Sequence, residues 1–358
     1  MKGIDPVEWH SGTAEGGSLP PENVRFSEML RCAPAAGHSE ERGVRVSRAQ
    51  GTVLRQRLPP LFSPNIPFLI FLPEVIFMLL TLITLLSLIC AVGITCAADG
   101  FAGTVWLWCL PLSFAGAWVV LLLLTLLVLV LICAGIDKEK PQEHDDPAFR
   151  RVTALYSELA VQLTMHLRMT GREKLPKSGR FLLVCNHLSD LDPVVLMHAF
   201  PKSQLAFISK KENTDMPVIG KMMHRLMCQL LNRENNREAL KTILTCVRLI
   251  QEDEVSIAVF PEGYTSKDGK LHHFRSGVFK IAMKTKVPIV VCTIQGTNTI
   301  LRPFAKEVRL GRPVELHLLE VIPPEAYEGL TTVELSDLVF HKMLADLGDA
   351  FTPTEQNP

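Results

Sequence analysis

The chain has 358 residues, and its 37 basic and 37 acidic side chains give a formal net charge of zero. This balance excludes a general electrostatic attraction to nucleic acid, and the length predicts two or three domains or segments. The nine cysteines include no Cys-x-x-Cys pair, so the sequence predicts neither a disulfide framework nor a zinc site.

Residues 1–60 mix glycine, proline, serine and charged residues without apolar clusters. Such a segment cannot bury enough apolar surface to fold alone, and we predict that it is disordered. Because no apolar segment follows Met1, we expect no cleavable signal peptide.

Two long apolar blocks come next in the chain. Their uninterrupted parts, residues 75–98 and 114–136, are 24 and 23 residues long and contain no charged side chain. A helix needs about 20 apolar residues to cross a bilayer, whereas a helix of a soluble domain would show polar positions at every turn. We therefore predict a two-helix transmembrane hairpin over residues 66–136, with a turn at Asp99 and Gly100.

Basic residues flank this hairpin but are absent from its connecting loop. Cytoplasmic flanks are enriched in Lys and Arg, so we expect both ends of the hairpin and the domain that follows to be cytoplasmic, at a bacterial cell membrane. The flanking residues are Arg42, Arg45, Arg48, Arg55 and Arg57 before the hairpin, and Lys138, Lys140, Arg150 and Arg151 after it.

Residues 137–165 are predicted to form a charged linker and then an amphipathic helix from about residue 148 to 164. Apolar side chains recur in it at helical spacing. Two interpretations stay open: this stripe packs against the core of the next domain, or it rests on the bilayer surface. The stripe consists of Val152, Leu155, Tyr156, Leu159 and Leu163.

Strand-like and helix-like segments alternate over residues 166–350, before a short tail at 351–358. This alternation predicts an α/β layer fold. Strands are expected at residues 167–170, 181–185, 205–209, 255–260, 289–294 and 314–319, and helices at 194–200, 217–230, 237–251 and 274–286. A capping box formed by Thr331 and Glu334 predicts a final helix to about residue 347.

The apolar run at residues 181–185 ends in a polar turn that contains His187 and Asp192. The α/β folds place their chemistry at such strand ends. Histidine titrates near neutral pH, which makes His187 the candidate general base, and Asp192 is close enough to orient its ring. The spacing alone is weak support, because His341 and Asp346 have the same spacing within a predicted helix.

Cys185, which lies two residues before His187, has two interpretations. Its thiol could act as a covalent nucleophile, or it could be a small buried strand residue. The second role is the commoner one for an unpaired cysteine.

The apolar run at residues 255–260 ends in a second polar turn, in which Glu262 is followed by Gly263. With this turn the chain resembles the glycerolipid acyltransferase family, which includes the lysophosphatidic acid acyltransferases. The resemblance covers residues 167–321. The blocks that carry it are Asn186, His187 and Asp192; Phe260 to Gly263 with Ser266; and Val287-Pro288-Ile289-Val290.

The resemblance implies a mixed sheet flanked by helices and an enzyme that moves an acyl group from acyl-CoA or acyl carrier protein to a lysophospholipid. The implied acceptor is 1-acylglycerol 3-phosphate, which gives phosphatidic acid. His187 would take the proton of the acceptor hydroxyl, Asp192 would orient His187, and no metal or other cofactor would take part. The blocks also make Asn186, Glu262, Gly263 and Ser266 candidate substrate-binding residues.

Basic residues are concentrated around the second turn, where residues 263–312 hold ten Lys and Arg against two Asp and Glu. A phosphate-bearing substrate favours such a charge, although a solvated surface would show it too. The candidate phosphate ligands are Arg275, at the start of a predicted helix, and Arg233, where the family has a substrate-binding arginine. The family's Thr-Arg after Phe-Pro-Glu-Gly is replaced by Tyr264 and Thr265, which leaves the acceptor headgroup open.

Two other functions are compatible with these residues. The chain could acylate another lysolipid or an amino-acid lipid, or it could be a non-catalytic membrane protein that binds lipid on a decayed enzyme scaffold. The presence of His187, Asp192 and Glu262 argues against decay, and the missing arginine argues for it.

Overall fold

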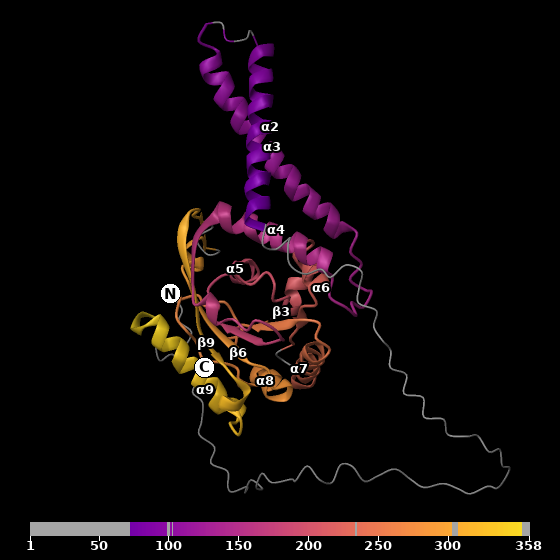
Figure 1. Ribbon diagram of the computed structural model, residues 1–358, viewed down its shortest axis with the longest axis vertical. Coiled ribbons are helices and arrows are strands. Elements are labelled where there is room, and N and C mark those ends of the chain that lie inside the picture. The colour runs from indigo at the N-terminus through magenta and orange to yellow at the C-terminus, as the bar shows by residue number, and fades with distance from the viewer. Residues whose placement is uncertain (1–71, 99–100, 102, 233–234, 303–306, 353–358) are drawn as a thin grey trace, which may run out of the picture. The chain divides into compact units, whose positions relative to one another are not determined.

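The structure is a computed structural model that describes residues 72–98, 101, 103–232, 235–302 and 307–352 (Figure 1). Several predictions lie outside the described residues: the disorder of residues 1–60, the start of the hairpin at residues 66–71, the phosphate contact of Arg233 and most of the C-terminal tail.

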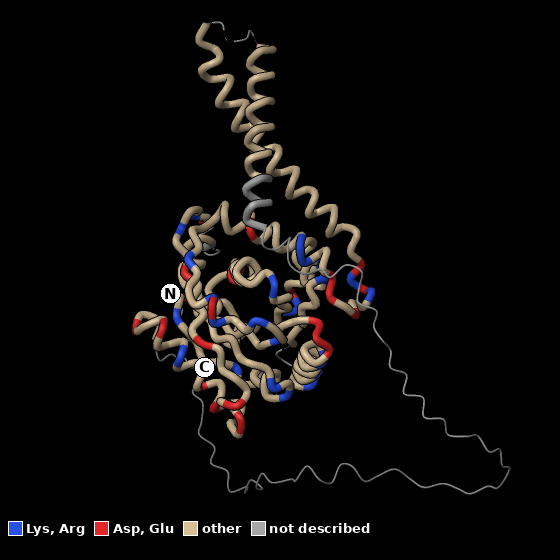
Figure 2. Tube along the Cα trace, viewed as in Figure 1, with Lys and Arg blue, Asp and Glu red and all other residues tan. Residues whose placement is uncertain are grey.

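Two long apolar helices, α2 (Leu72–Ala97) and α3 (Trp106–Ala134), pack against each other. Both are long and apolar enough to cross a membrane, and Figure 2 shows no charged residue along α3 or along the described side chains of α2. The helix α3 begins before the predicted residue 114 and includes Pro111, which has no backbone N–H to donate within the helix. The placement of these helices in a bilayer stays a prediction.

Helix α4 (Pro147–Thr164) begins where Asp146 accepts hydrogen bonds from the N–H groups of Ala148 and Phe149, both at 3.0 Å. Proline at the first helical position adds to this start signal. The predicted apolar stripe divides between two neighbours. Leu159 is buried in the α/β domain, while the Tyr156 hydroxyl donates to a backbone carbonyl of α3. Contact of the stripe with a bilayer stays a prediction.

A seven-stranded mixed sheet forms the centre of the domain, with the order β1-β9-β6-β2-β5-β3-β4. All neighbouring strands are parallel except β6 and β9. A separate hairpin of β7 (Leu301–Arg302) and β8 (Glu307–Val308) was not predicted from the sequence. The strands of the main sheet are β1 (Met165–Thr170), β2 (Leu182–Cys185), β3 (Leu205–Ser209), β4 (Gln229–Leu230), β5 (Ser256–Val259), β6 (Ile289–Gln295) and β9 (Arg312–Ile322).

Helices cover both faces of the sheet, which explains why the central strands are apolar throughout. Along β2, Leu183 and Cys185 belong to the core under α4 and α5 (Asp192–Ala199), and Leu182 and Val184 belong to the core on the other face. That second core is closed by α7 (Asn236–Gln251), α8 (Lys280–Thr285) and α9 (Thr332–Leu347), which lie opposite α4 and α5 (Figure 1). The prediction of an α/β fold with a mixed sheet is confirmed.

Two predicted helices differ from the structure. The helix expected at residues 217–230 is only α6 (Ile219–Arg225), because Met227 has a left-handed φ of 59° and the chain then continues into β4. The helix expected at residues 274–286 begins as a 3₁₀ turn and continues as α8. The capping box of Thr331 and Glu334 is confirmed at the start of α9.

Candidate active site

The two polar turns meet because the strands that precede them are parallel neighbours. In the β2–β5 pair, Leu182 lies opposite Ile257 and Val184 opposite Val259. The carboxyl ends of both strands therefore reach the same edge of the sheet, which we call the active-site edge. The turn with His187 leaves β2 at this edge, and the turn with Glu262 leaves β5 beside it.

Asp192 is held rigidly at the start of α5 and bonds to His187. Its Oδ2 lies 2.8 Å from His187 Nδ1 and accepts the N–H groups of Leu188 and Ser189 at 2.7 and 2.8 Å. Its Oδ1 accepts the hydroxyl of Thr297 at 2.6 Å. Asp192 is fully buried, and these four hydrogen bonds compensate for the free-energy cost of burying its carboxylate. They also fix the direction in which Asp192 orients the imidazole.

The other ring nitrogen of His187 points toward the loop after β5. Nε2 lies 3.2 Å from the hydroxyl of Thr265, and the ring stacks on Phe260 with its centroid 4.1 Å away. The His187 side chain is 16% exposed. Because the Nδ1–H group donates a hydrogen bond to the Asp192 carboxylate, Nε2 of the neutral ring keeps a lone pair. The arrangement presents one accessible base at the active-site edge.

Glu262 connects the second turn to the first. Its Oε1 accepts the His187 N–H at 2.8 Å and its Oε2 accepts the His272 N–H at 3.0 Å. Burial raises the pKa of Glu262 to about 8, and these two hydrogen bonds oppose the rise. Its carboxyl group faces the backbone of His187, so its observed role is to position that residue. Direct contact with an acceptor stays a prediction.

Asn186, Gly263 and Ser266 also lie at the active-site edge. Asn186 is buried and bonds both backbone groups of Ile294 in β6, at 3.0 and 2.8 Å. Ser266 donates its N–H to the His187 carbonyl at 2.8 Å, and Gly263 has the left-handed φ of 82° that this turn requires. Ser266 thus joins the two turns, and Asn186 joins the first turn to β6. Contact of these three residues with substrate stays a prediction.

Arg275 lies beside the second turn with an exposed side chain. Its backbone N–H donates to the Pro261 carbonyl at 2.8 Å, and it lines a small cavity of about 30 Å³ together with Gly263. Burial raises the pKa of the Tyr264 phenol, and the positive charge of Arg275 opposes that rise. A positive charge is thus present next to the loop where an acceptor phosphate was predicted.

Cys185 is fully buried in β2. Burial holds the pKa of its thiol well above the usual value, and the negative charges of Asp192 and Glu262 add to this effect. A buried, protonated thiol is a poor nucleophile, which supports the interpretation of Cys185 as a core residue.

Thr297 and Thr265 are parts of the site that sequence reasoning missed. Thr297 follows β6, 105 residues after Asp192, and no local pattern joins the two. One signal was available: the block at residues 287–290 marks the start of β6, and the carboxyl end of that strand leads to Thr297.

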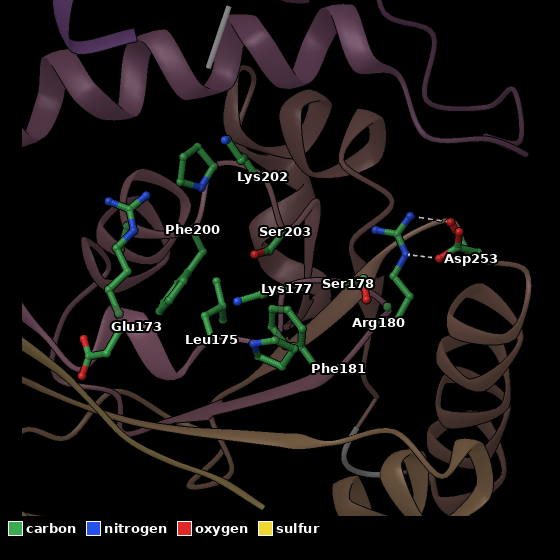
Figure 3. Close-up of a pocket in the computed structure, with 15 residues that line it drawn as sticks. Glu173, Leu175, Lys177, Ser178, Arg180, Phe181, Phe200, Lys202, Ser203 and Asp253 are labelled. Atoms are coloured by element: carbon green, nitrogen blue, oxygen red, sulfur yellow. Dashed lines mark hydrogen bonds and ion pairs between the residues drawn. The ribbon is translucent and has the colours of Figure 1, made fainter. Parts of the chain in front are cut away.

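A larger cavity, of about 560 Å³, lies at the opposite end of β2. Lys177, Lys202 and Phe200 are among the residues around it, and Arg180 points to Asp253 at its side, with 2.7 Å between Nε and Oδ1 (Figure 3). None of the side chains of His187, Asp192 and Glu262 lines it. The candidate active site is therefore the shallow edge described above and not this cavity.

Comparisons with known proteins agree with this geometry. The family model described as Acyltransferase matches residues 166–295. A probable 1-acyl-sn-glycerol-3-phosphate acyltransferase of Mycoplasma pneumoniae is 32% identical over 185 residues, which is 49% of this chain and 68% of that protein. A 1-acyl-sn-glycerol-3-phosphate acyltransferase of Limnanthes douglasii is 29% identical over 192 residues, 54% of this chain and 65% of the relative.

Among solved structures, the 1-acyl-sn-glycerophosphate acyltransferase PlsC from Thermotoga maritima is 25% identical with a TM-score of 0.48, covering 60% of this chain and 84% of that one. The chain spans about half to two thirds of the length of the first curated relatives. The match of the family model and the extent of the Mycoplasma relative lead to one conclusion. The chain belongs to the glycerolipid acyltransferase family.

Proposed function

We propose that the protein is a membrane-anchored enzyme that acylates 1-acylglycerol 3-phosphate to phosphatidic acid. The observation that carries the proposal is the His187–Asp192 pair, whose Nε2 is the accessible base at the active-site edge. Relatives named as 1-acyl-sn-glycerol-3-phosphate acyltransferases support the choice of acceptor. The acyl donor is a thioester, either acyl-CoA or acyl carrier protein.

The first step is proton transfer from the acceptor hydroxyl to Nε2 of His187 as the oxygen attacks the thioester carbonyl carbon. The Asp192 carboxylate, 2.8 Å from Nδ1, stabilises the imidazolium that forms. The tetrahedral intermediate then collapses, the carbon–sulfur bond breaks, and the imidazolium returns its proton to the departing thiolate. Ester and free thiol are the products, and neither a covalent acyl-enzyme nor a cofactor is part of this proposal.

The acceptor phosphate would be bound by Arg275, whose backbone is fixed to the second turn by the bond to Pro261. Arginine suits this task because its planar donors match phosphate oxygens. The family arginine that contacts this phosphate corresponds to Thr265 here, and that position faces Nε2 of His187. This substitution is the specific observation that favours a second acceptor class, another lysolipid or an amino-acid lipid.

The helices α2 and α3 would anchor the enzyme in the membrane, and the basic flanks would keep the domain at the cytoplasmic leaflet of a bacterial cell membrane. Both substrates of the reaction carry long acyl chains, so an anchored domain meets the acceptor without extracting it into water.

The test is acyl transfer by the full chain in phospholipid vesicles, with isotope-labelled acyl-CoA or acyl carrier protein and a panel of lysolipids, followed by mass spectrometry. Labelled phosphatidic acid is expected with 1-acylglycerol 3-phosphate. Product from a different lysolipid alone would establish the second acceptor class.

His187→Ala should abolish the product, and Cys185→Ala, a change at a neighbouring buried position, should preserve it. Loss of transfer with Cys185→Ala but not with His187→Ala would reject the mechanism. Absence of any labelled lipid with both donors would leave the non-catalytic, lipid-binding function.

A further inference from the structure

Four large apolar side chains outside the hairpin are strongly exposed at two places on the domain. Met216 and Ile219, which precede and begin α6, are each 46% exposed. Val308 and Leu310, at and just after β8, are 61% and 62% exposed. We call the first pair the α6 lip and the second pair the β8 lip. Clustered apolar side chains at a surface indicate an interaction site.

Sheet topology places these lips on either side of the candidate active site. The α6 lip follows the carboxyl end of β3, and the β8 lip follows the carboxyl end of β6. In the sheet order β6-β2-β5-β3, the two catalytic turns leave the inner strands β2 and β5. Because these four strands are mutually parallel, both lips and both turns lie at the same edge. His187 is therefore between two apolar projections.

The α6 lip is joined to the end of the second apolar helix. Lys221 of α6 donates from Nζ to the carbonyl of Ala134 at 3.0 Å, and Lys138 donates to the carbonyl of Thr214 at 2.8 Å. Leu226, directly after α6, shares a small apolar core with Cys133 and Ile136. The segment that contains this lip is thus fixed to the end of α3.

The β8 lip is joined to the far end of α4. The N–H of Gly311 donates to the carbonyl of Thr164, the last residue of α4, at 2.8 Å. The start of α4 lies at the other lip, because Phe149 packs in the same small core as Leu226. Figure 1 shows α6 at one end of α4. The 18 residues of α4 separate the two lips by about 27 Å.

Charge around the lips is compatible with an anionic surface. Near the α6 lip, the exposed or partly exposed cations Lys210, Lys211 and Lys221 outnumber Glu212 and Asp215. Arg312, two residues after Leu310, is exposed beside the β8 lip. Lysine and arginine next to apolar side chains are typical of segments at the headgroup level of a bilayer.

We propose that both lips insert into the headgroup region of the leaflet that faces the domain, so that the bilayer lies directly against the active-site edge. The partner is the phospholipid bilayer itself, and the inference rests on the proposed membrane anchoring. The acceptor would then diffuse within the leaflet between the lips and present its hydroxyl to Nε2 of His187. The lips fix how close the edge comes to the lipid, which the hairpin alone does not do.

The chain contains its own controls for this proposal. Leu244 on α7 and Val333 on α9 are 45% and 55% exposed, as apolar as the lips and as accessible. They lie on the helices that cover the opposite face of the sheet. Non-specific binding of lipid to exposed apolar side chains would occur equally at the lips and at these control positions. Contact with a bilayer at the active-site edge would occur at the lips alone.

The test is photo-crosslinking of the full chain in vesicles of phosphatidylglycerol and phosphatidylcholine, with benzoylphenylalanine replacing Ile219, Leu310, Leu244 or Val333 one at a time. Mass spectrometry then counts covalent lipid adducts. We expect adducts at Ile219 and at Leu310, at least about tenfold above those at the two controls. Adducts at only one lip, at neither, or equally at all four positions would overturn the proposal.

A second measurement connects docking to turnover. The double variant Ile219→Glu with Leu310→Glu should lower the ratio of acylation rate in vesicles to that in detergent micelles about tenfold, because a charge resists insertion. Leu244→Glu with Val333→Glu should leave the ratio unchanged. An unchanged ratio in the lip variant would contradict a role of the lips in catalysis.

The crosslinking result does not depend on activity. Lipid adducts at both lips in a protein that transfers no acyl group would reject the proposed reaction but support the docking surface. Acyl transfer without adducts at the lips would support the reaction but reject the docking surface.

Discussion

Two clusters in this molecule contain the same three residue types in nearly the same geometry. At the active-site edge, Asp192 bonds His187 Nδ1 at 2.8 Å and the Thr297 hydroxyl at 2.6 Å. Between β9, β6 and α9, Asp346 bonds His317 Nδ1 at 2.7 Å and the Thr293 hydroxyl at 2.5 Å. In each cluster the histidine and the threonine bond to different carboxylate oxygens.

The surroundings separate a candidate catalytic pair from a structural brace. Asp192 also accepts two backbone N–H groups and is fully buried, whereas the described part of the chain shows no backbone donor to Asp346. His187 follows the carboxyl end of a parallel strand, and its ring is stacked on Phe260. His317 lies within the antiparallel strand β9, next to α9. Position in the sheet and backbone donors therefore distinguish the two clusters, because the side chains alone do not.

The largest difference between the clusters is expected from removal of the imidazoles. His187→Ala should reduce the turnover number about 10³-fold or more, because it removes the general base. His317→Ala should leave turnover close to that of the unmodified protein, since its ring bonds Asp346 of α9 and makes no described hydrogen bond to His187 or Asp192. Initial rates of acyl transfer in vesicles measure both. Comparable losses of turnover in the two variants would show that the clusters are functionally coupled and would contradict the distinction between them.

The next difference concerns the carboxylates. Asp192→Asn should reduce turnover about 10²- to 10³-fold with little change in KM, because an amide can present its NH₂ to the Nδ1–H and favour the wrong tautomer. Asp346→Asn should instead lower the melting temperature, through the loss of about 1–2 kcal/mol of hydrogen bonding. A steady-state kinetic analysis and a thermal melt of each variant separate these effects. Equal kinetics in the two variants would contradict the assignment.

The threonines should show a smaller effect of the same kind. Thr297→Val removes one of the four bonds that hold Asp192, and we expect turnover to fall about tenfold. Thr297→Ser should restore most of the rate, since it returns the hydroxyl. Thr293→Val should change stability but not rate. If Thr297→Ser is as slow as Thr297→Val, the threonine acts through its methyl packing and not through the hydrogen bond.

The last difference concerns stability and not turnover: Glu262, a carboxyl group that only the active-site edge possesses, should give a pH dependence of stability. Its pKa is about 8 in the folded protein against the ordinary value of 4.5. The folded state therefore binds the proton more tightly, so stability from this group falls as pH rises from about 4.5 to about 8 and is constant above. The slope is at most about 1.4 kcal/mol per pH unit.

Glu262→Gln should remove this slope, because glutamine does not titrate. Unfolding of the full chain in detergent, followed between about pH 5 and pH 9, gives the difference between the two proteins. A difference that stays constant across this range would mean that Glu262 is ionised throughout.

The sequence was a good guide where both faces of a strand are buried and a poor one where tertiary position decides. The predicted strand at residues 205–209 has the observed bounds of β3, because its side chains are confined on both faces. The predicted end of the helix at residue 230 was wrong, because methionine as a residue type does not indicate the left-handed φ of Met227. The strands β7 and β8 have only two residues each and give no periodic signal.

The same limit applies to the candidate site. The neighbourhood of His187 and Glu262 followed from their places after two buried strands, and the pairing of His187 with Asp192 followed from a turn. Thr297 could not be found without the strand order, which places β6 next to β2. The identical spacing of His341 and Asp346 is uninformative, because on a helix five residues turn the chain by about 500° and send the two side chains to different faces.

The contacts of the active-site residues with β6 and Thr297 join positions that are far apart in the sequence, which has a consequence for biosynthesis. Asn186 bonds Ile294 across 108 residues, and Asp192 bonds Thr297 across 105. A nascent chain that already carries the hairpin and His187 therefore lacks these contacts to Asn186 and Asp192 until the segment around Thr297 leaves the ribosome. The proposed acylation would therefore begin only after most of the polypeptide has been translated, and a prematurely terminated product would lack this activity.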